Sequence, residues 1–332
     1  SIILVSHDLG VIANICNKII VMKDGIIQEI GNKHQIINNP QKEYTKELIN
    51  SYSKNDYIEN GFNDNSKDIV FDVKNLNVNW KKTNIFNYFN NKKMSNTSVG
   101  IVDVSLKIFK GNRVGIVGES GSGKSTLAKA IINIQKPSNG EIYFNKNNLM
   151  NLNKDQTIKM RQDVQMIFQD PYSSLNPKST IRKLLIEPLK FHKITNKANY
   201  EKKIVELIFK VGLDNKFLDK YPHQLSGGQC QRVNIARALS VNPKILIADE
   251  PTSSLDVTIQ AQIIELIINL CKKMELTLIF ISHDLRVVKN ICNKIIVMKG
   301  GKIIESGSTY EVFHKTKNTY TKELITSVLS IN

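Results

Sequence analysis

The residues with the clearest chemical meaning form a glycine-rich loop between an apolar run and a helix-forming stretch. Their spacing matches GxxxxGK[ST], in which glycines let main-chain amides converge on phosphate oxygens and the next helix adds its positive N-terminal end. Lys124 is predicted to reach the β- and γ-phosphates, and the Ser125 hydroxyl to bind Mg²⁺. The loop therefore predicts a nucleoside triphosphate site. Its residues are Gly118, Glu119, Ser120, Gly121, Ser122, Gly123, Lys124, Ser125 and Thr126.

Two acidic residues, Asp249 and Glu250, end another apolar run, KILIADE. Asp249 would lie beside the glycine loop and hold Mg²⁺ through water, and Glu250 would orient or deprotonate the attacking water. Strand ends often carry solvated acids, so this pair alone is a weak signal. Because it follows a phosphate-binding loop in the chain, it predicts hydrolysis of the bound nucleotide.

The sequence LSGGQ at Leu225–Gln229 comes directly before a helix-forming stretch. A serine and two glycines at a helix N-terminus make a second anion-binding surface. Ser226 is also a good N-cap, so an ordinary capped helix is the competing interpretation. The spacing alone does not identify the phosphate that this surface would bind.

The order of apolar runs and amphipathic stretches predicts the scaffold that carries these motifs. Runs at 114–117, 244–249 and 276–282 are continuously apolar, as in strands that are buried on both faces of a sheet. Helical periodicity lies between them, which favours an α/β fold with mostly parallel strands. The stretch of about 175–240 is mainly helical in pattern and is predicted to be an inserted helical subdomain.

An internal repeat divides the chain. Residues 1–51 align with 277–327 without a gap and are identical at 27 of 51 positions, including the ten-residue stretch NICNKIIVMK. A duplication at this distance predicts two domains in tandem, with most of the first one missing. The expected parts are a C-terminal remnant of a first domain at 1–50, a polar linker at 51–67 and a complete domain at 68–330.

Composition limits the class of protein. Hydrophobic residues make up 41% of the chain, enough for a buried core, and no apolar run is long enough to predict a membrane-spanning helix. We also expect no signal peptide, because the chain opens on a stretch that resembles a strand and a turn. The net charge of +16 could indicate an anionic partner, but the charges are dispersed and nucleic-acid binding is not expected. The four cysteines form no CxxC pair, so neither a metal nor a disulfide role is predicted.

Six motifs in a fixed order make the chain resemble the ATP-binding cassette (ABC) ATPases. They are Walker A at 118–125, a Q-loop at Gln169, the signature Leu225–Gln229, Walker B ending at Asp249 and Glu250, a D-loop at Ser253–Asp256 and the switch His283. The likeness covers about 68–330, and 1–50 is similar to the tail of a second such domain that begins just before His7. It implies a P-loop NTPase with an ABC-type core, an antiparallel β subdomain and an inserted helical subdomain.

The resemblance implies a cycle in which two ABC domains enclose two ATP molecules. Each ATP lies between the Walker A loop of one domain and the signature of the other, here Ser226, Gly227, Gly228 and Gln229. Glu250 and His283 would act in catalysis, with His283 on the γ-phosphate, and Gln169 would sense that phosphate or join the Mg²⁺ ligands. Trp80 is the candidate for stacking on adenine, with a core or loop aromatic as the alternative. Because 1–50 cannot complete a site, we expect hydrolysis only when two copies pair.

Longer stretches resemble a narrower group, the ATPase subunits of bacterial dipeptide and oligopeptide importers. They are FQDPYSSLNP at Phe168–Pro177, LSGGQCQRVNIARAL and ADEPTSSLDVTIQAQI. The likeness implies permease subunits and a second ABC domain as partners, an extracytoplasmic solute-binding protein acting indirectly, and a peripheral location on the cytoplasmic face of the bacterial inner membrane. Cys230 replaces the usual arginine, and KEYT and NTYT replace HPYT. These departures bear on the solute more than on ATP hydrolysis.

Three functions are open on the sequence alone. The favoured one is the ATPase of a peptide importer, although related importers carry nickel, glutathione or other small solutes. A soluble ABC ATPase that acts on nucleic acid or ribosomes is the second, supported only by the positive charge. A non-catalytic binding module is the third, and the intact Lys124, Glu250 and His283 argue against it.

Overall fold

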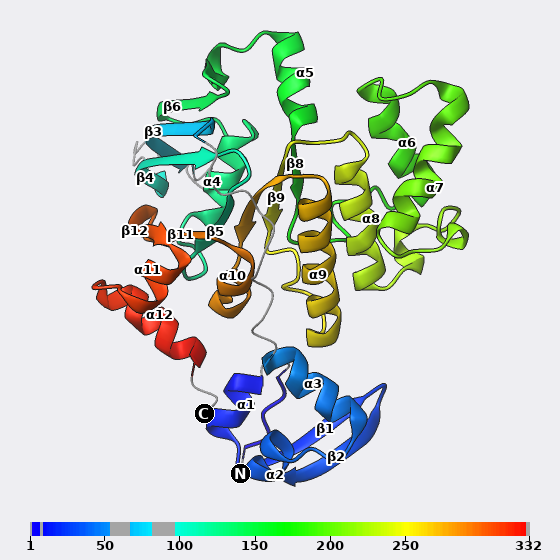
Figure 1. Cartoon of the computed structure of the whole chain (residues 1–332), viewed down its shortest axis with the longest axis vertical. Coiled ribbons are helices and arrows are strands. Elements are labelled where there is room, and N and C mark those ends of the chain that lie inside the picture. Colours follow the sequence, from blue (N-terminus) through cyan, green and yellow to red (C-terminus); the bar gives the residue numbers. More distant parts are fainter. Residues whose placement is uncertain (1, 7–8, 54–66, 82–96, 330–332) are drawn as a thin grey trace, which may run out of the picture.

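The protein is described here from a computed structural model of the full chain (Figure 1). The structure describes residues 2–6, 9–53, 67–81 and 97–329. A large unit contains two sheets with helices around them, and a small N-terminal unit contains a third sheet (Figure 1). No described helix is long and apolar enough to cross a bilayer.

A six-stranded sheet forms the centre of the large unit. Its strands are β5 (Arg113–Val117), β8 (Val164–Ile167), β9 (Ile245–Asp249), β10 (Thr277–Ile281), β11 (Lys294–Lys299) and β12 (Lys302–Ser308). They lie in the order β12-β11-β5-β10-β9-β8, and only the β11–β12 pair is antiparallel. β5, β9 and β10 are buried along their whole length, because other elements cover both faces of the sheet. The predicted α/β fold with a mostly parallel sheet is confirmed.

A second, antiparallel sheet lies next to the Walker A helix. Its strands are β3 (Ile69–Lys81), β4 (Thr97–Phe109), β6 (Asn139–Phe144) and β7 (Asn147–Asn148), in the order β4-β3-β6-β7. Phe71 and Val73 of β3 are buried in the core that this sheet shares with the central one. The expected antiparallel β subdomain is therefore present.

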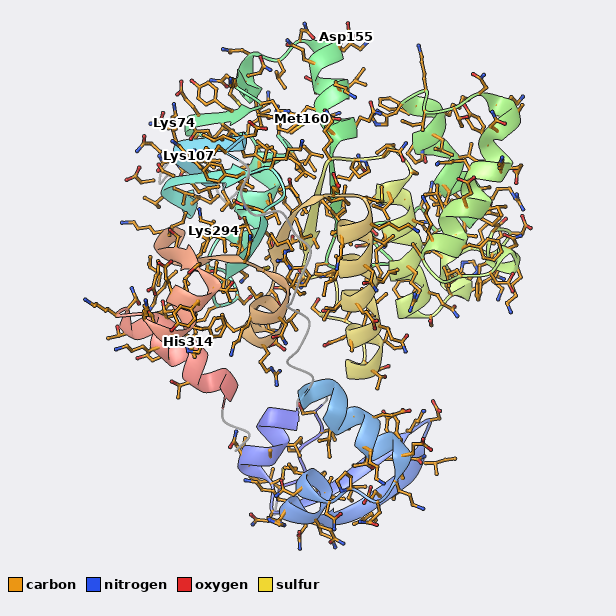
Figure 2. All side chains as sticks on the ribbon, viewed as in Figure 1. Lys74, Lys107, Asp155, Met160, Lys294 and His314 are labelled. Atoms are coloured by element: carbon orange, nitrogen blue, oxygen red, sulfur yellow. The ribbon has the colours of Figure 1, made fainter. Side chains whose placement is uncertain are left out.

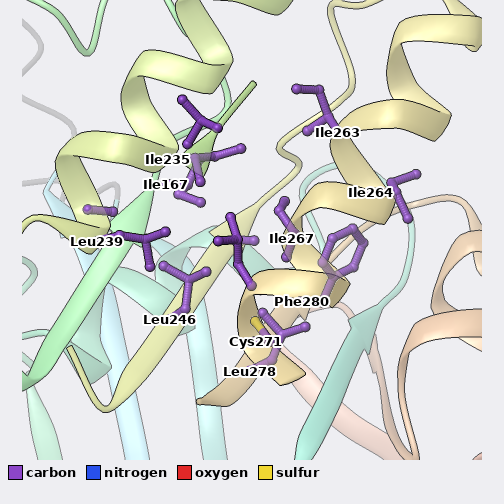
Figure 3. Close-up of a cluster of buried hydrophobic side chains, with 14 of the residues drawn as sticks. Ile167, Ile235, Leu239, Leu246, Ile263, Ile264, Ile267, Cys271, Leu278 and Phe280 are labelled. Atoms are coloured by element: carbon purple, nitrogen blue, oxygen red, sulfur yellow. The ribbon is translucent and has the colours of Figure 1, made fainter. Parts of the chain in front are cut away.

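Helices cover both faces of the central sheet and create two apolar cores. The helices are α4 (Lys124–Ile131), α5 (Lys154–Asp163), α6 (Ile181–Phe191), α7 (Tyr200–Lys210), α8 (Gly227–Leu239), α9 (Val257–Lys273), α10 (Leu285–Ile291), α11 (Thr309–His314) and α12 (Thr319–Leu329). Leu246 of β9 packs with Leu239 of α8 and Ile267 of α9 in one core (Figure 3). Its neighbour Ile247 belongs to the core on the opposite face, together with Leu127 of α4. Helices α6, α7 and α8 occupy the stretch with the helical pattern.

The N-terminal unit repeats a part of the large unit. It consists of α1 (Leu9–Ile15), β1 (Lys18–Lys23), β2 (Ile26–Asn32), α2 (Lys33–Asn38) and α3 (Glu43–Ser53). This order matches α10, β11, β12, α11 and α12. The two hairpins share one pairing register, and an irregularity falls between Val21 and Met22 in one and between Val297 and Met298 in the other. The internal repeat of the sequence is therefore also a repeat of structure.

Charged side chains lie on many elements of the surface (Figure 2). Lys107 on β4 and Asp155 on α5 are both exposed and lie apart from each other in this view. Some lysines lie beside acids, as where Lys74 Nζ is 3.8 Å from Asp72 Oδ2. This distribution agrees with the dispersed charge of the sequence.

Candidate active site

The glycine loop turns sharply from β5 into α4, and three of its glycines have a backbone that other residues rarely adopt. The φ angles are 147° at Gly118, 79° at Gly121 and 102° at Gly123. A Cβ atom on Gly118 would lie 2.2 Å from the carbonyl oxygen of Met298, and one on Gly123 would lie 2.7 Å from that of Gly100. The loop is thus pressed against neighbouring backbone, which fixes the directions of its amides.

Lys124 is the first residue of α4 and is 4% exposed. Its ammonium donates hydrogen bonds of 2.8 Å to the carbonyl oxygens of Gly118 and Glu119, so it lies inside the curl of the loop. Burial lowers the pKa of Lys124, while the nearby carboxylates of Glu250 and Asp249 oppose that shift. A triphosphate entering the loop would offer this buried cation stronger partners than two neutral carbonyls.

Ser125 and Asp249 bring two oxygen ligands together at the ends of α4 and β9. The Ser125 hydroxyl donates a 2.8 Å hydrogen bond to Asp249 Oδ1, and Asp249 is 3% exposed. Burial raises the pKa of Asp249, and the hydrogen bond from Ser125 opposes the rise. A hydroxyl and a carboxylate beside a phosphate-binding loop are the hard oxygen donors that Mg²⁺ prefers, so this pair fits the predicted metal site.

Glu250 is held by two polar side chains at one carboxylate oxygen. Gln169 Nε2 donates to Glu250 Oε2 at 3.0 Å, and His283 Nδ1 lies 3.5 Å from the same oxygen. The interaction with His283 lowers the pKa of Glu250, which burial partly offsets, and Glu250 in turn raises the pKa of His283. Glu250 is therefore ionised at neutral pH, as a base that accepts a proton from water must be.

One cleft of about 900 Å³ is lined by half of the predicted site residues, while Gly118, Glu119, Ser122 and Asp249 lie outside its lining. Its lining includes Ser120, Gly121, Gly123, Lys124, Ser125, Thr126, Gln169, Glu250 and His283 from the prediction. It also includes Asp170, Gly100, and Ser253 and Ser254 of the D-loop. Asp170 directly follows the Q-loop glutamine, a signal that sequence reasoning could have used. Gly100 lies in β4 and belongs to no recognised motif, so its place in the cleft is seen only in the folded structure.

The predicted signature residues do not line this cleft in the described part of the chain. Ser226 caps α8, accepting a hydrogen bond from the Gln229 amide, and Gln229 Oε1 accepts one from the Ser226 amide. An added Cβ on Gly228 would lie 2.6 Å from Ile259 Cγ2 of α9, and one on Gly227 would lie 3.0 Å from Cδ2 of Leu255, just before α9. The structure thus does not bring the signature to the Walker A loop of the same chain.

The structure describes the side chain of Cys230 but not those of Trp80 and His7. Cys230, in place of the usual arginine, is fully buried, and burial raises its pKa to about 11, so it stays a neutral thiol. The backbone of Trp80 pairs with Ser98 at the end of β3, but its side chain lies outside the described part of the structure, as does His7. Stacking of Trp80 on adenine therefore stays a prediction.

Comparisons with known proteins identify relatives of the chain. The profile of the ABC transporter family matches residues 101–253, and the profile described as oligopeptide/dipeptide transporter, C-terminal region, matches 28–70. The oligopeptide transport ATP-binding protein OppF of Haemophilus influenzae is 45% identical over 265 residues, which are 80% of this chain and 79% of that protein. The peptidoglycan transport ATP-binding protein YejF of Agrobacterium fabrum is 36% identical over 335 residues, which are 100% of this chain but 59% of the longer relative.

Solved structures show the same fold. A dimeric ATP-binding cassette in a post-hydrolysis state, bound to ADP and phosphate, matches with a TM-score of 0.63 and 31% identity. The match covers 72% of this chain and 98% of that cassette. Family, relatives and fold agree with the geometry of the cleft. The chain belongs to the ABC transporter family of ATP-binding proteins, and it is an ATPase.

Proposed function

We propose that this ABC ATPase energises an importer of peptides from the cytoplasmic face of a bacterial inner membrane. The observation that supports its ATPase role is the cleft lined by Walker A residues, Ser125 and Glu250, with Asp249 hydrogen-bonded to Ser125. The peptide cargo is supported by the name of the Haemophilus influenzae relative and by the match of the C-terminal region profile. Permease subunits would be its membrane partners, and an extracytoplasmic solute-binding protein would act through them. Nucleic acid is not part of this proposal.

Binding of ATP would depend on the loop and on Lys124. The amides of 118–126 would surround the phosphates, and Lys124, placed by the carbonyls of Gly118 and Glu119, would reach the β- and γ-phosphates. Ser125 and Asp249 would hold Mg²⁺, with Gln169 as a further ligand. When bound, Mg²⁺ supplies positive charge that neutralises the phosphate oxygens. Trp80 is kept as the proposed adenine contact.

Hydrolysis would depend on Glu250 and the two residues that hold it. Glu250 would orient the attacking water and accept its proton, because its carboxylate is ionised and faces the cleft. Gln169 and His283 now share one oxygen of Glu250, and both would turn to the γ-phosphate side when nucleotide enters. This exchange of partners would link the state of the nucleotide to the Q-loop, and so to a permease.

A complete site would need the signature of a second ABC domain. Ser226, Gly227, Gly228 and Gln229 would bind the ATP held by a partner, since they do not reach the cleft of their own chain. Figure 1 places α8, which begins at the signature, next to α9 and away from β12. Pairing of two copies would close both sites, and hydrolysis would reopen them.

Residues 1–50 are proposed to be the C-terminal part of a first ABC domain, joined by 51–67 to the complete domain at 68–330. The strands β1 and β11 have the same sequence, KIIVMK, but different surroundings. Ile296 and Met298 of β11 are 3% and 0% exposed, because β5 and its core cover them. Ile20 and Met22 at the equivalent positions are 54% and 56% exposed. A core like that around β5 would bury this face.

A chimera tests the domain proposal. Because residue 1 aligns with residue 277, fusing a copy of residues 68–276 directly before Ser1 should rebuild a whole first domain. The expected result is two MgATP sites per chain by calorimetry and loss of binding of an apolar fluorescent dye. The control is the same fusion with Ile20→Lys and Met22→Lys, in which the rebuilt core should fail to cover this face of β1. A fusion protein that still binds the dye and has no second nucleotide site would contradict the proposal.

The transport proposal predicts a defect in peptide uptake. Deleting the gene in its host should lower uptake of a labelled tetrapeptide at least about tenfold, because an importer without ATP hydrolysis cannot accumulate its solute. The wild-type chain should restore uptake, and Lys124→Ala should not. Labelled glutathione and Ni²⁺ are measured in parallel. Loss of one of these, with peptide uptake unchanged, would replace the peptide assignment.

A further inference from the structure

The Walker A loop is in direct contact with the C-terminal helix α12. Tyr320, in the first turn of α12, is 5% exposed, and its hydroxyl accepts a 3.1 Å hydrogen bond from the main-chain amide of Glu119. Lys299, at the end of β11, places its Nζ 4.2 Å from the centre of the tyrosine ring. The ring is therefore fixed between β11 and the loop, with its hydroxyl aimed at one peptide group.

The residue that carries this amide, Glu119, also holds the phosphate-binding lysine. The carbonyl oxygen of Glu119 accepts hydrogen bonds from Lys124 Nζ at 2.8 Å and from the Ser122 amide at 3.2 Å. One residue of the loop is thus tied to Tyr320 through its N–H and to Lys124 through its carbonyl. Rotation of this residue would move the lysine, so the tyrosine restricts where the ammonium lies.

The C-terminal part of the domain touches the loop at a second point. Gly301, in the turn between β11 and β12, donates its amide to the carbonyl oxygen of Ser122 at 3.0 Å. The unit from β11 to α12 therefore holds both sides of the glycine loop, at Glu119 and at Ser122. These two bonds help to set the shape of the loop before ATP arrives.

The internal repeat shows that the Lys–Tyr pair belongs to this C-terminal unit itself. Lys23 and Tyr44 are the repeat equivalents of Lys299 and Tyr320, and Lys23 Nζ lies 4.6 Å from the centre of the Tyr44 ring. No Walker A loop lies among the described residues of the N-terminal unit. The pair therefore forms without the loop, which means that the unit presents the tyrosine as a ready-made acceptor.

We propose that Tyr320 is a positioning residue of the ATP site, which orients the Glu119 peptide and thereby Lys124 for the incoming phosphates. This inference rests on the proposed role of the Walker A loop. The hydroxyl does not touch the nucleotide in this role. It raises the affinity of the loop for ground state and transition state alike, so its loss affects KM and leaves kcat nearly unchanged.

The test is steady-state ATPase kinetics of Tyr320→Phe. The KM for MgATP should rise about three- to tenfold, as expected for one lost hydrogen bond, with kcat within about twofold and an unchanged melting temperature. Tyr310→Phe is the matched control, because Tyr310 lies on α11 of the same unit and is 62% exposed. Lys299→Met, which removes the cation over the ring, should raise KM in the same direction by less.

The outcomes separate the inference from the proposed function. An unchanged KM in Tyr320→Phe, or a fall in kcat at constant KM, would overturn the positioning role while leaving the ATPase intact. If Tyr320→Phe does not fold, the KM of Lys299→Met is the test, and an unchanged KM in that variant overturns the inference. A wild-type protein that does not hydrolyse ATP would instead count against the proposed function.

Discussion

Glu250→Gln is expected to lower the ATPase kcat by about 10²–10⁴-fold while MgATP binding is retained, which is the range for loss of a general base. Glutamine has nearly the same shape, so Gln169 keeps a hydrogen-bond partner at this position, but the amide cannot take a proton from water. Blocked hydrolysis should also trap two chains around ATP, because the signature residues stay intact. Phosphate release and light scattering with and without MgATP measure the two effects.

The matched control for this variant is Glu265→Gln. Glu265 is an exposed residue of α9 and does not line the cleft. It should leave kcat unchanged and should not produce a trapped dimer. A Glu250→Gln protein with wild-type kcat would exclude Glu250 as the base. A variant that binds ATP but stays monomeric at all concentrations would contradict the pairing of two copies.

Lys124→Ala has the second large effect, a loss of MgATP affinity of about 100-fold or more with no measurable turnover. The ammonium would make charge-assisted hydrogen bonds to two phosphates, each contributing about 1.5–3 kcal/mol. Alanine removes these bonds. It also removes the positive charge that offsets the carboxylates of Asp249 and Glu250 near the phosphates. Calorimetry with MgATP measures the affinity, and circular dichroism checks that the variant is folded.

An exposed lysine supplies the control for the second prediction. Lys136 lies just after α4 and is exposed, and Lys136→Ala should bind MgATP like the wild type. This comparison separates the position of the charge from the net charge of the protein. If Lys124→Ala keeps wild-type affinity and turnover, the phosphates are bound elsewhere.

Local spacing was enough to predict the position and the backbone geometry of the Walker A loop. Three glycines, the lysine and the serine lie within eight residues, and their geometry follows from the backbone freedom of glycine and the start of a helix. The position of Asp249 beside the glycine loop was also expected, and its hydrogen bond with Ser125 agrees with that position. Such features need only the chain order and a parallel sheet.

Contacts between distant parts of the chain were harder to predict. The sequence put Gln169, Glu250 and His283 in one site only through the family resemblance. The sequence analysis missed the contact between Tyr320 and Glu119, which are 201 positions apart. The only hint in the sequence was that Tyr320 begins the repeated stretch YTKELI. The two copies of KIIVMK likewise differ in exposure because only one of them has β5 as a neighbour. Identical residues thus acquire different roles from tertiary packing.

The most direct test of the account is a calorimetric titration of the purified wild-type chain with MgATP. The account predicts saturable binding with one nucleotide per chain, because the described residues contain one Walker A loop and the N-terminal unit brings none. Absence of binding would contradict the central claim that this loop and Lys124 hold the triphosphate. Binding of two nucleotides per chain would contradict the view that residues 1–50 lack a site of their own.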